Sequence, residues 1–365
     1  MGLTAGIVGL PNVGKSTLFN AITKKNILAA NYPFATIEPN VGIVIVKDER
    51  LEYLAEKETP ERVIPTAYEF IDIAGLVKGA SKGEGLGNKF LSHIREVDAI
   101  CEVVRCFKDP NITHVEGDID PIRDIEIIDL ELIISDLEIV NNRLDKIEKK
   151  AVTSKDKDAL EEVSALRKVK YVLEQNIPAR RLEYTEDENK ILKNFNLLTK
   201  KPIIYMANVS EEDINTGNEY VELVKEHASK ENAKVVMLSA KVESELSELP
   251  DEDKEMFLEE LGIKESGLDK LVKATYDLLG LATFFTAGKD ECKAWTFRKG
   301  MKAPACAGII HSDFEKGFIR AEVTSFEDYK EYGGEKGAKE AGRMRLEGKD
   351  YLMQDGDIVF FRFNV

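Results

Sequence analysis

The chain has no apolar run long enough to cross a membrane, and no basic segment followed by a cleavable apolar core. We therefore expect a cytoplasmic protein that does not enter a membrane. Only four cysteines occur in 365 residues, and none shows CxxC spacing or pairs with a histidine in a metal-binding pattern. They are expected to be ordinary interior residues in a reducing compartment.

Basic residues are outnumbered, with 51 Lys and Arg against 67 Asp and Glu, so the net charge is −16. Such an acidic chain argues against a general nucleic-acid coat, and we expect no DNA partner, although a local basic face remains compatible with this charge. The hydrophobic fraction of 43% and charged fraction of 32% fit a soluble, folded protein. The length predicts two or three domains.

The most informative segment is Gly9–Ser16, which matches the phosphate-binding pattern GxxxxGK[ST]. A strand-like stretch, Thr4–Val8, precedes it and a helix-like stretch, Thr17–Thr23, follows it. In this context backbone N–H groups cradle phosphates, Lys15 reaches the β- and γ-phosphates, and Ser16 ligates Mg²⁺. The chain is therefore predicted to bind a nucleoside triphosphate. The expected phosphate-binding residues are Asn12, Val13, Gly14, Lys15, Ser16 and Thr17.

A second phosphate-site element, DxxG, begins at Asp72, directly after the strand-like stretch Tyr68–Ile71. Asp72 is expected to hold Mg²⁺ through water, and the Gly75 N–H to sense the γ-phosphate. Thr36 is a candidate first-switch residue that completes the Mg²⁺ shell when triphosphate is bound. The predicted metal ligands are thus Ser16, Thr36 and Asp72.

The base-reading element is expected after the strand-like stretch Ile203–Met206, at Asn208–Glu211. The usual guanine-reading pattern is NKxD, but Val209 stands where Lys would be and Glu211 where Asp would be. Losing the Lys stem and lengthening the carboxylate both weaken the case for guanine. Ser239 and Ala240, with the following lysine, match the loop that normally covers the base. Asn208, Val209, Glu211, Ser239 and Ala240 are the predicted base-side contacts.

The residue that positions the attacking water is not evident. Leu76 occupies the place of the water-orienting Gln of Ras-like GTPases and cannot orient water. The alternatives are backbone groups, a bound cation, His114 or His93, and surface or packing roles remain open for both histidines. Lys15 and His114 are the catalytic candidates. Asn12 is a candidate ligand for K⁺ beside the phosphates.

Residues 1–120 alternate strand-like and helix-like stretches, which predicts a parallel sheet with helices on both faces. Two long amphipathic segments between residues 122 and 176 predict an antiparallel helical hairpin inserted into this domain. Basic residues outnumber acidic ones between 143 and 181, so this hairpin presents either an RNA contact or a solvated face. Short strand-like pieces from residue 281 onward, Gly308–Ile310 among them, predict a small α+β module.

The chain resembles the YchF/Obg-like ATPases at three of these motifs: Gly9–Ser16, Asp72–Val77 with Gly83–Gly87, and Asn208–Glu211. The segments Phe314–Glu322, Gly337–Gly342 and Gln354–Asp357 resemble that family's TGS domain. The resemblance covers the whole chain. It implies an α/β P-loop NTPase of the TRAFAC type with an inserted antiparallel coiled-coil hairpin and a C-terminal β-grasp TGS domain. The corresponding domains are 1–125 with 196–280, 126–195, and 281–365.

The resemblance also implies a preference for ATP over GTP and association with ribosomes. We therefore predict a slow, Mg²⁺-dependent ATPase, expected to be a monomer, whose nucleotide state controls ribosome or RNA binding in translation or stress response. The alternative is a nucleotide-gated ribosome adaptor in which hydrolysis is incidental. An ordinary GTPase is the third possibility.

Overall fold

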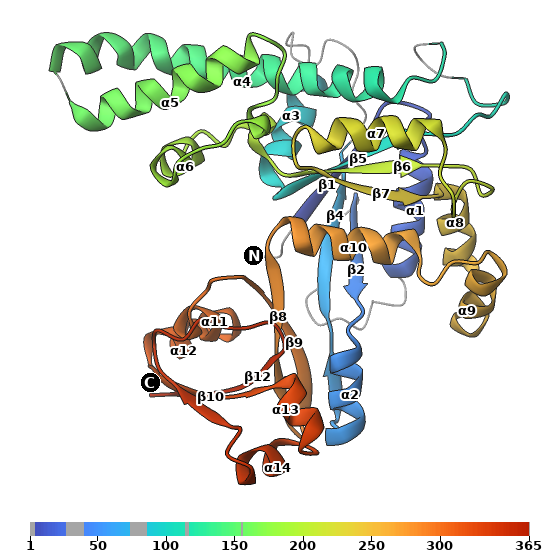
Figure 1. Cartoon of the computed structure of the whole chain (residues 1–365), viewed down its shortest axis with the longest axis vertical. Coiled ribbons are helices and arrows are strands. Elements are labelled where there is room, and N and C mark those ends of the chain that lie inside the picture. The colour runs from blue at the N-terminus through green and yellow to red at the C-terminus, as the bar shows by residue number, and fades with distance from the viewer. Residues whose placement is uncertain (1–3, 27–39, 74–85, 114–116, 155, 365) are drawn as a thin grey trace. The chain divides into compact units, whose positions relative to one another are not determined.

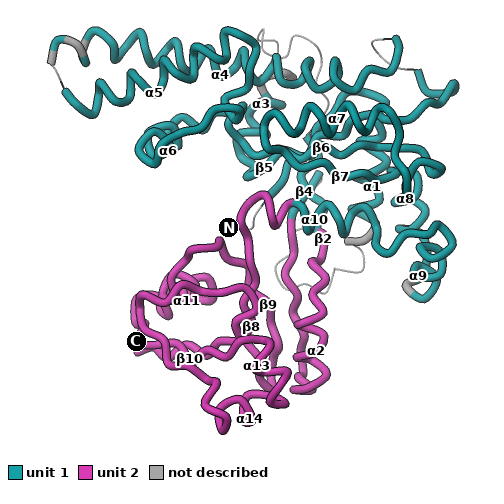
Figure 2. The backbone as a smooth tube through the Cα atoms, in the orientation of Figure 1, with its two compact units in different colours: residues 1–30, 36–43, 69–274 teal, residues 31–35, 44–68, 275–365 magenta. Residues whose placement is uncertain are grey.

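A computed structural model of the chain describes residues 4–26, 40–73, 86–113, 117–154 and 156–364. Two compact units divide the described chain, and Figure 2 distinguishes them. The first unit holds the described residues up to 43 and from 69 to 274, and the second holds 44–68 and 275–364. Within the described ranges, no helix combines the length and apolarity that a membrane span needs.

The first unit is organised on a six-stranded sheet with the order β2-β4-β1-β5-β6-β7. Its strands are β1 (Thr4–Val8), β2 (Val41–Val46), β4 (Thr66–Asp72), β5 (Ala99–Arg105), β6 (Ile203–Asn208) and β7 (Lys234–Leu238). The pairs β1–β4, β1–β5, β5–β6 and β6–β7 are parallel. Every residue of β5 and β6 is buried, as expected for central parallel strands covered on both faces.

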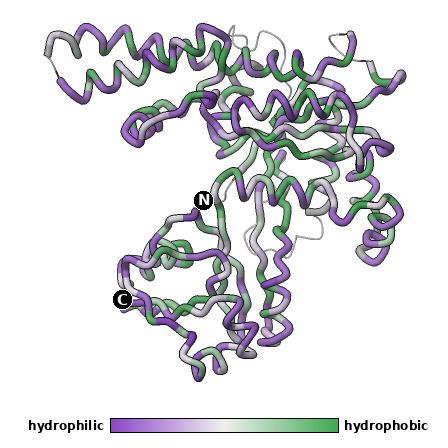
Figure 3. The backbone as a smooth tube through the Cα atoms, in the orientation of Figure 1, coloured by the Kyte–Doolittle hydropathy of each residue, from purple (hydrophilic) through white to green (hydrophobic). Residues whose placement is uncertain are grey.

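Helices lie on both faces of this sheet (Figure 1). Apart from the hairpin described below, the longer helices of this unit are α1 (Lys15–Asn26), α3 (Leu86–Glu96), α7 (Glu219–Ser229), α8 (Ala240–Glu248), α9 (Asp251–Glu260) and α10 (Gly267–Leu278). The start of α7 is fixed by Asn218, whose side chain accepts hydrogen bonds from the amides of Tyr220 and Val221. Hydrophobic residues concentrate along the central strands (Figure 3). The parallel sheet predicted from the sequence is confirmed.

A helical hairpin of α4 (Pro121–Ser154) and α5 (Lys157–Leu173) follows β5. The two helices lie side by side (Figure 1), and buried residues such as Leu144, Ile147, Leu166 and Val169 pack between them. Three short helices bring the chain back to the sheet: η2 (Ala179–Arg181), α6 (Glu186–Lys193) and η3 (Leu198–Lys200).

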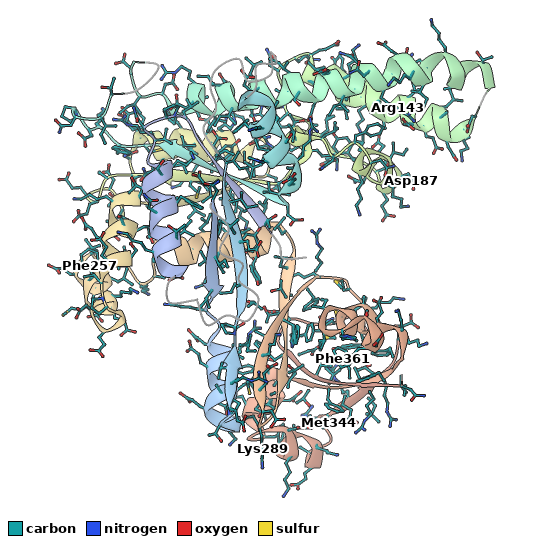
Figure 4. The ribbon with its side chains drawn as sticks, turned by 180° about the vertical axis from the view of Figure 1, so that it is seen from behind. Arg143, Asp187, Phe257, Lys289, Met344 and Phe361 are labelled. Atoms are coloured by element: carbon teal, nitrogen blue, oxygen red, sulfur yellow. The ribbon has the colours of Figure 1, made fainter. Side chains whose placement is uncertain are left out.

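The basic residues of this region do not form one free face. Arg143, marked in Figure 4, pairs with Glu162 across the hairpin. Arg180 was predicted to belong to the basic face but is buried. Its Nη2 lies 2.5 Å from Oδ1 of Asp129, and its Nε lies 2.9 Å from Oε2 of Glu231. The grouping was wrong for Arg180, because the fold places it at the base of the hairpin, against α4 and the end of α7.

The second unit is built on a sheet with the order β11-β10-β12-β8-β9-β3. Its strands are β3 (Arg62–Ile64), β8 (Leu281–Ala287), β9 (Glu291–Arg298), β10 (Phe318–Ser325), β11 (Arg345–Glu347) and β12 (Asp357–Phe363). Its helices are α2 (Glu49–Glu58), α11 (Ala303–Ile310), α12 (Ser312–Lys316), α13 (Phe326–Glu331) and α14 (Glu335–Glu340).

An aromatic core holds the second unit together, with Phe284, Phe297 and Phe361 buried between the sheet and α11. The predicted strand at Gly308–Ile310 is wrong, because these residues form the last turn of α11. A short apolar run does not distinguish a buried strand from a buried helix, and here proline in the first turn starts a helix.

Candidate functional site

The glycine-rich loop between β1 and α1 is shaped by close backbone approaches. Gly14 has φ +100°, and a Cβ there would lie 2.2 Å from Nδ2 of Asn208. A Cβ on Gly9 would lie 2.9 Å from the carbonyl oxygen of Val103. Only glycine fits such positions without displacing the neighbouring strands. These close approaches fix the path of the loop between β1 and α1.

A cation and a carboxylate meet beside this loop. Lys15, at the first position of α1, forms an ion pair with Asp72, the last residue of β4. The parallel register places Asp72 opposite Ile7 of β1, one strand away from the loop. Ser16 and Thr17 are exposed in the first turn of α1. The hydroxyl of Ser16 and the carboxylate of Asp72 are hard oxygen donors, so this donor set fits Mg²⁺.

Several predicted residues cannot be compared with this geometry. Thr36, Gly75, Leu76 and His114 lie outside the described residues. Asp72 is the described part of the second phosphate-site element, and it is the last residue of β4. His93 is exposed on α3.

Asn208, at the end of β6, is buried and connects three parts of the site. Its Nδ2 donates to the carbonyl of Val13 at 2.8 Å, and its Oδ1 accepts from the amide of Ala240 at 2.9 Å. The residue is only 3% exposed. Asn208 therefore joins the phosphate loop to β6 and to the start of α8. It acts as a brace, and its neighbour Val209 is buried as well.

Glu211 lies at the edge of the same site and is paired with Lys241, with 3.2 Å between Oε2 and Nζ. This carboxylate, followed by that of Glu245, raises the pKa of Lys241 above its usual value. Ser239 is buried just before α8 and does not cap that helix through its side chain. The predicted base-side residues are thus brought together, with Glu211 and Lys241 on the exposed rim.

A cavity of about 1140 Å³ opens between these elements. Its lining includes residues that were predicted from the sequence, in the phosphate loop, the loop after β6 and the start of α8: Asn12, Gly14, Thr17, Asn208, Val209, Glu211, Ser239 and Ala240. Two further walls were not predicted, the loop after β5 with Phe107 and Ile112, and the start of α7 with Asn218 and Tyr220. The first wall follows a strand at the ligand-binding edge of a parallel sheet, which is the signal that could have identified it.

Asn12 joins the phosphate loop to the wall after β5. It adopts φ +64°, and its Nδ2 donates to the carbonyl of Thr113 at 3.1 Å. Asparagine tolerates this left-handed backbone better than most residues. In the structure, the side chain of Asn12 therefore contacts a neighbouring loop.

A separate cluster has metal-binding residue types. Asp129, His227 and Glu231 present ligand atoms within 4.8 Å of one another. Arg180 donates Nη2 to Asp129 and Nε to Glu231. Its guanidinium bridges the two carboxylates, so the cluster is an internal charge network at the base of the hairpin. Desolvation lowers the pKa of His227 and outweighs the nearby charge of Glu231, which acts in the opposite direction. The lowered pKa favours the neutral imidazole.

The parallel sheet, the glycine loop entering α1, the acidic residue ending β4 and the buried Asn ending β6 together define a P-loop nucleoside triphosphate-binding protein. In agreement, residues 4–136 match the family profile MMR_HSR1, described as "50S ribosome-binding GTPase". Residues 281–364 match the profile YchF-GTPase_C, described as "Protein of unknown function (DUF933)".

Full-length relatives identify the family. The chain is 63% identical to the "Ribosome-binding ATPase YchF" of Bacillus subtilis and 53% identical to that of Escherichia coli O157:H7, in both cases over 100% of each chain. A solved structure titled "Structure of the Schizosaccharomyces pombe YchF GTPase" is 41% identical, with a TM-score of 0.89, and the match covers 99% of this chain and 98% of that one. The chain belongs to the YchF family. The resemblance inferred from the motifs and the expected α/β P-loop fold are confirmed.

Proposed function

We propose that the protein is a Mg²⁺-dependent ATPase that prefers ATP over GTP, turns over slowly, and binds ribosomes in a nucleotide-dependent way. The observation that carries this proposal is the loop Asn208–Glu211, whose side chains differ from a guanine reader at two positions. Curated relatives are named ribosome-binding ATPases, whereas the solved relative is titled a GTPase. The choice of base is therefore the central question.

The structure supports a base site that lacks guanine selectivity. A guanine reader uses a free carboxylate for N1 and N2 of the base, whereas the carboxylate of Glu211 is occupied by Lys241. Val209 has no long stem to pack along a purine, and its side chain is buried. Asn208 braces the loop and has its donor and acceptor engaged with Val13 and Ala240. None of these groups would be left unpaired by adenine, so the site does not penalise ATP.

On the phosphate side, Lys15 exchanges its partner during binding. The ammonium now paired with Asp72 is proposed to move to the β- and γ-phosphates, where it balances charge in the transition state. Asp72, released from Lys15, is then free to hold metal-bound water beside the Ser16 hydroxyl. When bound, Mg²⁺ would neutralise charge that develops on the phosphates. Thr36 and Gly75 are proposed to complete the metal shell and the γ-phosphate contact.

Slow turnover follows from Leu76, which cannot orient water. We propose that His114, or K⁺ held beside the phosphates with the help of Asn12, takes over part of this task. The proposed domains are 1–125 with 196–280, the hairpin 126–195, and a TGS domain at 281–365. A profile match at 281–364 supports the bounds of the last domain, whereas residues 44–68 belong to the second compact unit of the structure. A monomeric, cytoplasmic protein with the ribosome and ATP as partners, and no DNA or membrane partner, completes the proposal.

Single-turnover hydrolysis of ATP and GTP, with and without ribosomes, tests this function. We expect ATP to be hydrolysed, and ribosomes to accelerate the reaction strongly. ATP-dependent ribosome binding with no hydrolysis under any condition would instead establish the nucleotide-gated adaptor. Competition binding in which GTP displaces ATP at much lower concentration would establish an ordinary GTPase.

A further inference from the structure

Arg105, the last residue of β5, is an unusual residue for the interior of a sheet. It is 1% exposed and is among the largest fully buried side chains of the described protein. Burying an arginine costs several kcal/mol of desolvation unless its N–H groups find good acceptors. Desolvation indeed lowers the pKa of Arg105 from its usual value. An apolar residue would fill a simple core position at lower cost, so the guanidinium needs another explanation.

The hydrogen bonds of Arg105 supply that explanation. Nε donates to the carbonyl of Phe107 at 3.2 Å, Nη1 to that of Ile112 at 3.1 Å, and Nη2 to that of Asp109 at 3.4 Å. The guanidinium carbon also lies 4.7 Å from the centre of the Phe107 ring. All these contacts go to one segment, residues 107–112. A planar group with fixed donors thus holds the backbone of a loop that has no regular secondary structure.

This segment is one wall of the nucleotide cavity. Phe107, Lys108, Asp109 and Ile112 line the cavity that also contains the phosphate loop and Asn208. Arg105 is paired with Asn208 in the register of β5 and β6, so two adjacent strand ends carry the two braces of the cavity. At its far end the wall is attached to the phosphate loop, through the bond between Asn12 and the Thr113 carbonyl.

We propose that Arg105 is a positioning residue for nucleotide binding, holding the loop 107–112 from inside so that it forms a fixed wall of the cavity. This inference rests on the proposed function for the identity of the ligand, and on the geometry for the role of Arg105. Arg105 acts through the loop and does not itself line the cavity. Small displacements of positioned groups cost up to about a hundredfold in related situations, so the effect is measurable.

The test compares the full-length wild type with Arg105→Lys, which keeps the charge but cannot reach three carbonyls at once. We expect the Kd for AMPPNP with Mg²⁺ to rise roughly tenfold, equal to about 1.4 kcal/mol. Hydrogen–deuterium exchange of the ligand-free protein should become faster in peptides covering 107–113. The matched control is Arg95→Lys, whose arginine donates to Ser135 and to the carbonyl of Asn196, away from the cavity. This control should leave Kd unchanged.

A second variant tests the same loop in case Arg105→Lys does not fold. Asp109 stabilises the same loop by accepting from the amide of Asn111 at 2.8 Å, and Asp109→Ala removes that acceptor in a solvent-exposed region. We expect a roughly threefold rise in Kd, because one weak local bond is lost. Asp109→Asn, which keeps an acceptor oxygen, should give a smaller rise.

The outcomes are decisive in each case. If the Arg105→Lys protein folds with lower thermal stability and yet keeps the wild-type Kd and the wild-type hydrogen exchange of the loop, then Arg105 has only a structural role, and the proposal is overturned. If Arg105→Lys does not fold, unchanged Kd and exchange in Asp109→Ala overturn it. If the wild type binds GTP more tightly than ATP, the proposed preference for ATP is wrong, but the proposed role of Arg105 is not affected. That role is then tested in the same assay with GMPPNP.

Discussion

Asn208→Ala is the sharpest test of how the site is held together. The substitution removes two hydrogen bonds at once, one to the carbonyl of Val13 and one from the amide of Ala240. Both partners are main-chain groups in a buried setting, so each is left unsatisfied at a cost of about 1–3 kcal/mol. The space vacated by the side chain sits against Gly14, and water that enters it recovers part of the loss. We therefore expect a loss of about 2–4 kcal/mol in the free energy of unfolding.

The assay is urea unfolding followed by circular dichroism, with the change in midpoint compared at a common slope. Nucleotide affinity should fall with stability, because Val13 and Ala240 belong to the phosphate loop and the base loop. Asn215→Ala is the matched control, since the amide of Asn215 donates to the carbonyl of Leu261 in an exposed region. It should change stability by less than about 0.5 kcal/mol. If Asn208→Ala matched this control in stability and in ATP affinity, Asn208 would not be a brace.

Four further predictions address charge and chemistry. Lys15→Ala should abolish ATP binding or turnover, measured by titration and phosphate release, because the γ-phosphate loses its cation; wild-type hydrolysis would refute the role. His114→Ala should slow hydrolysis without weakening ATP binding, and an unchanged single-turnover rate would leave this histidine without a catalytic part. Replacing K⁺ by Na⁺ should slow hydrolysis if Asn12 helps to hold a cation, and equal rates in the two salts would remove that idea. Desolvation, followed by the field of Asp129, raises the pKa of the buried Glu102 well above its usual value. Folding therefore favours its protonated form, and the stability of the wild type should fall as pH rises from about 4.5 toward the folded pKa, by at most about 1.4 kcal/mol per pH unit. In Glu102→Gln this part of the pH dependence should be absent, so an unchanged pH profile of unfolding would contradict the assignment.

The parts of the site that could be predicted from the sequence rest on local chemistry. The phosphate loop could be located because its glycines, Lys15 and Ser16 are adjacent in sequence and flanked by a strand and a helix. Asp72 and Asn208 could be located because each ends a strand, and the carboxyl ends of parallel strands share one edge of the sheet. In these cases a residue type and its place on a strand are sufficient to indicate a position in the site.

The contacts that sequence reasoning missed depend on the tertiary structure. Nothing local distinguishes Arg180 from the exposed basic residues of the hairpin, because its partners Asp129 and Glu231 come from α4 and from the turn after α7. The same holds for Arg105, whose burial follows from the central place of β5 in the sheet. Charged residues are rarely buried, so composition alone favours an exposed position for both. Their acceptors become evident only when the chain is folded.

Asn208 and Arg105, the two braces of the cavity, hold different parts of it, and this bears on base choice. Asn208 has both polar groups of its side chain engaged with the backbone, and Arg105, paired with it in the strand register, donates to carbonyls of the loop that follows β5. In the proposed base site, Glu211 and Lys241 lie on the rim and form an exposed ion pair that is worth little on its own in water. Such a pair can be displaced without leaving a buried group unpaired, which makes rejection of a wrong base weak in this part of the site. The proposed preference for ATP would then depend on the fit of the cavity walls as well as on the loop Asn208–Glu211, and this is why the position of the loop 107–112 is expected to alter nucleotide affinity.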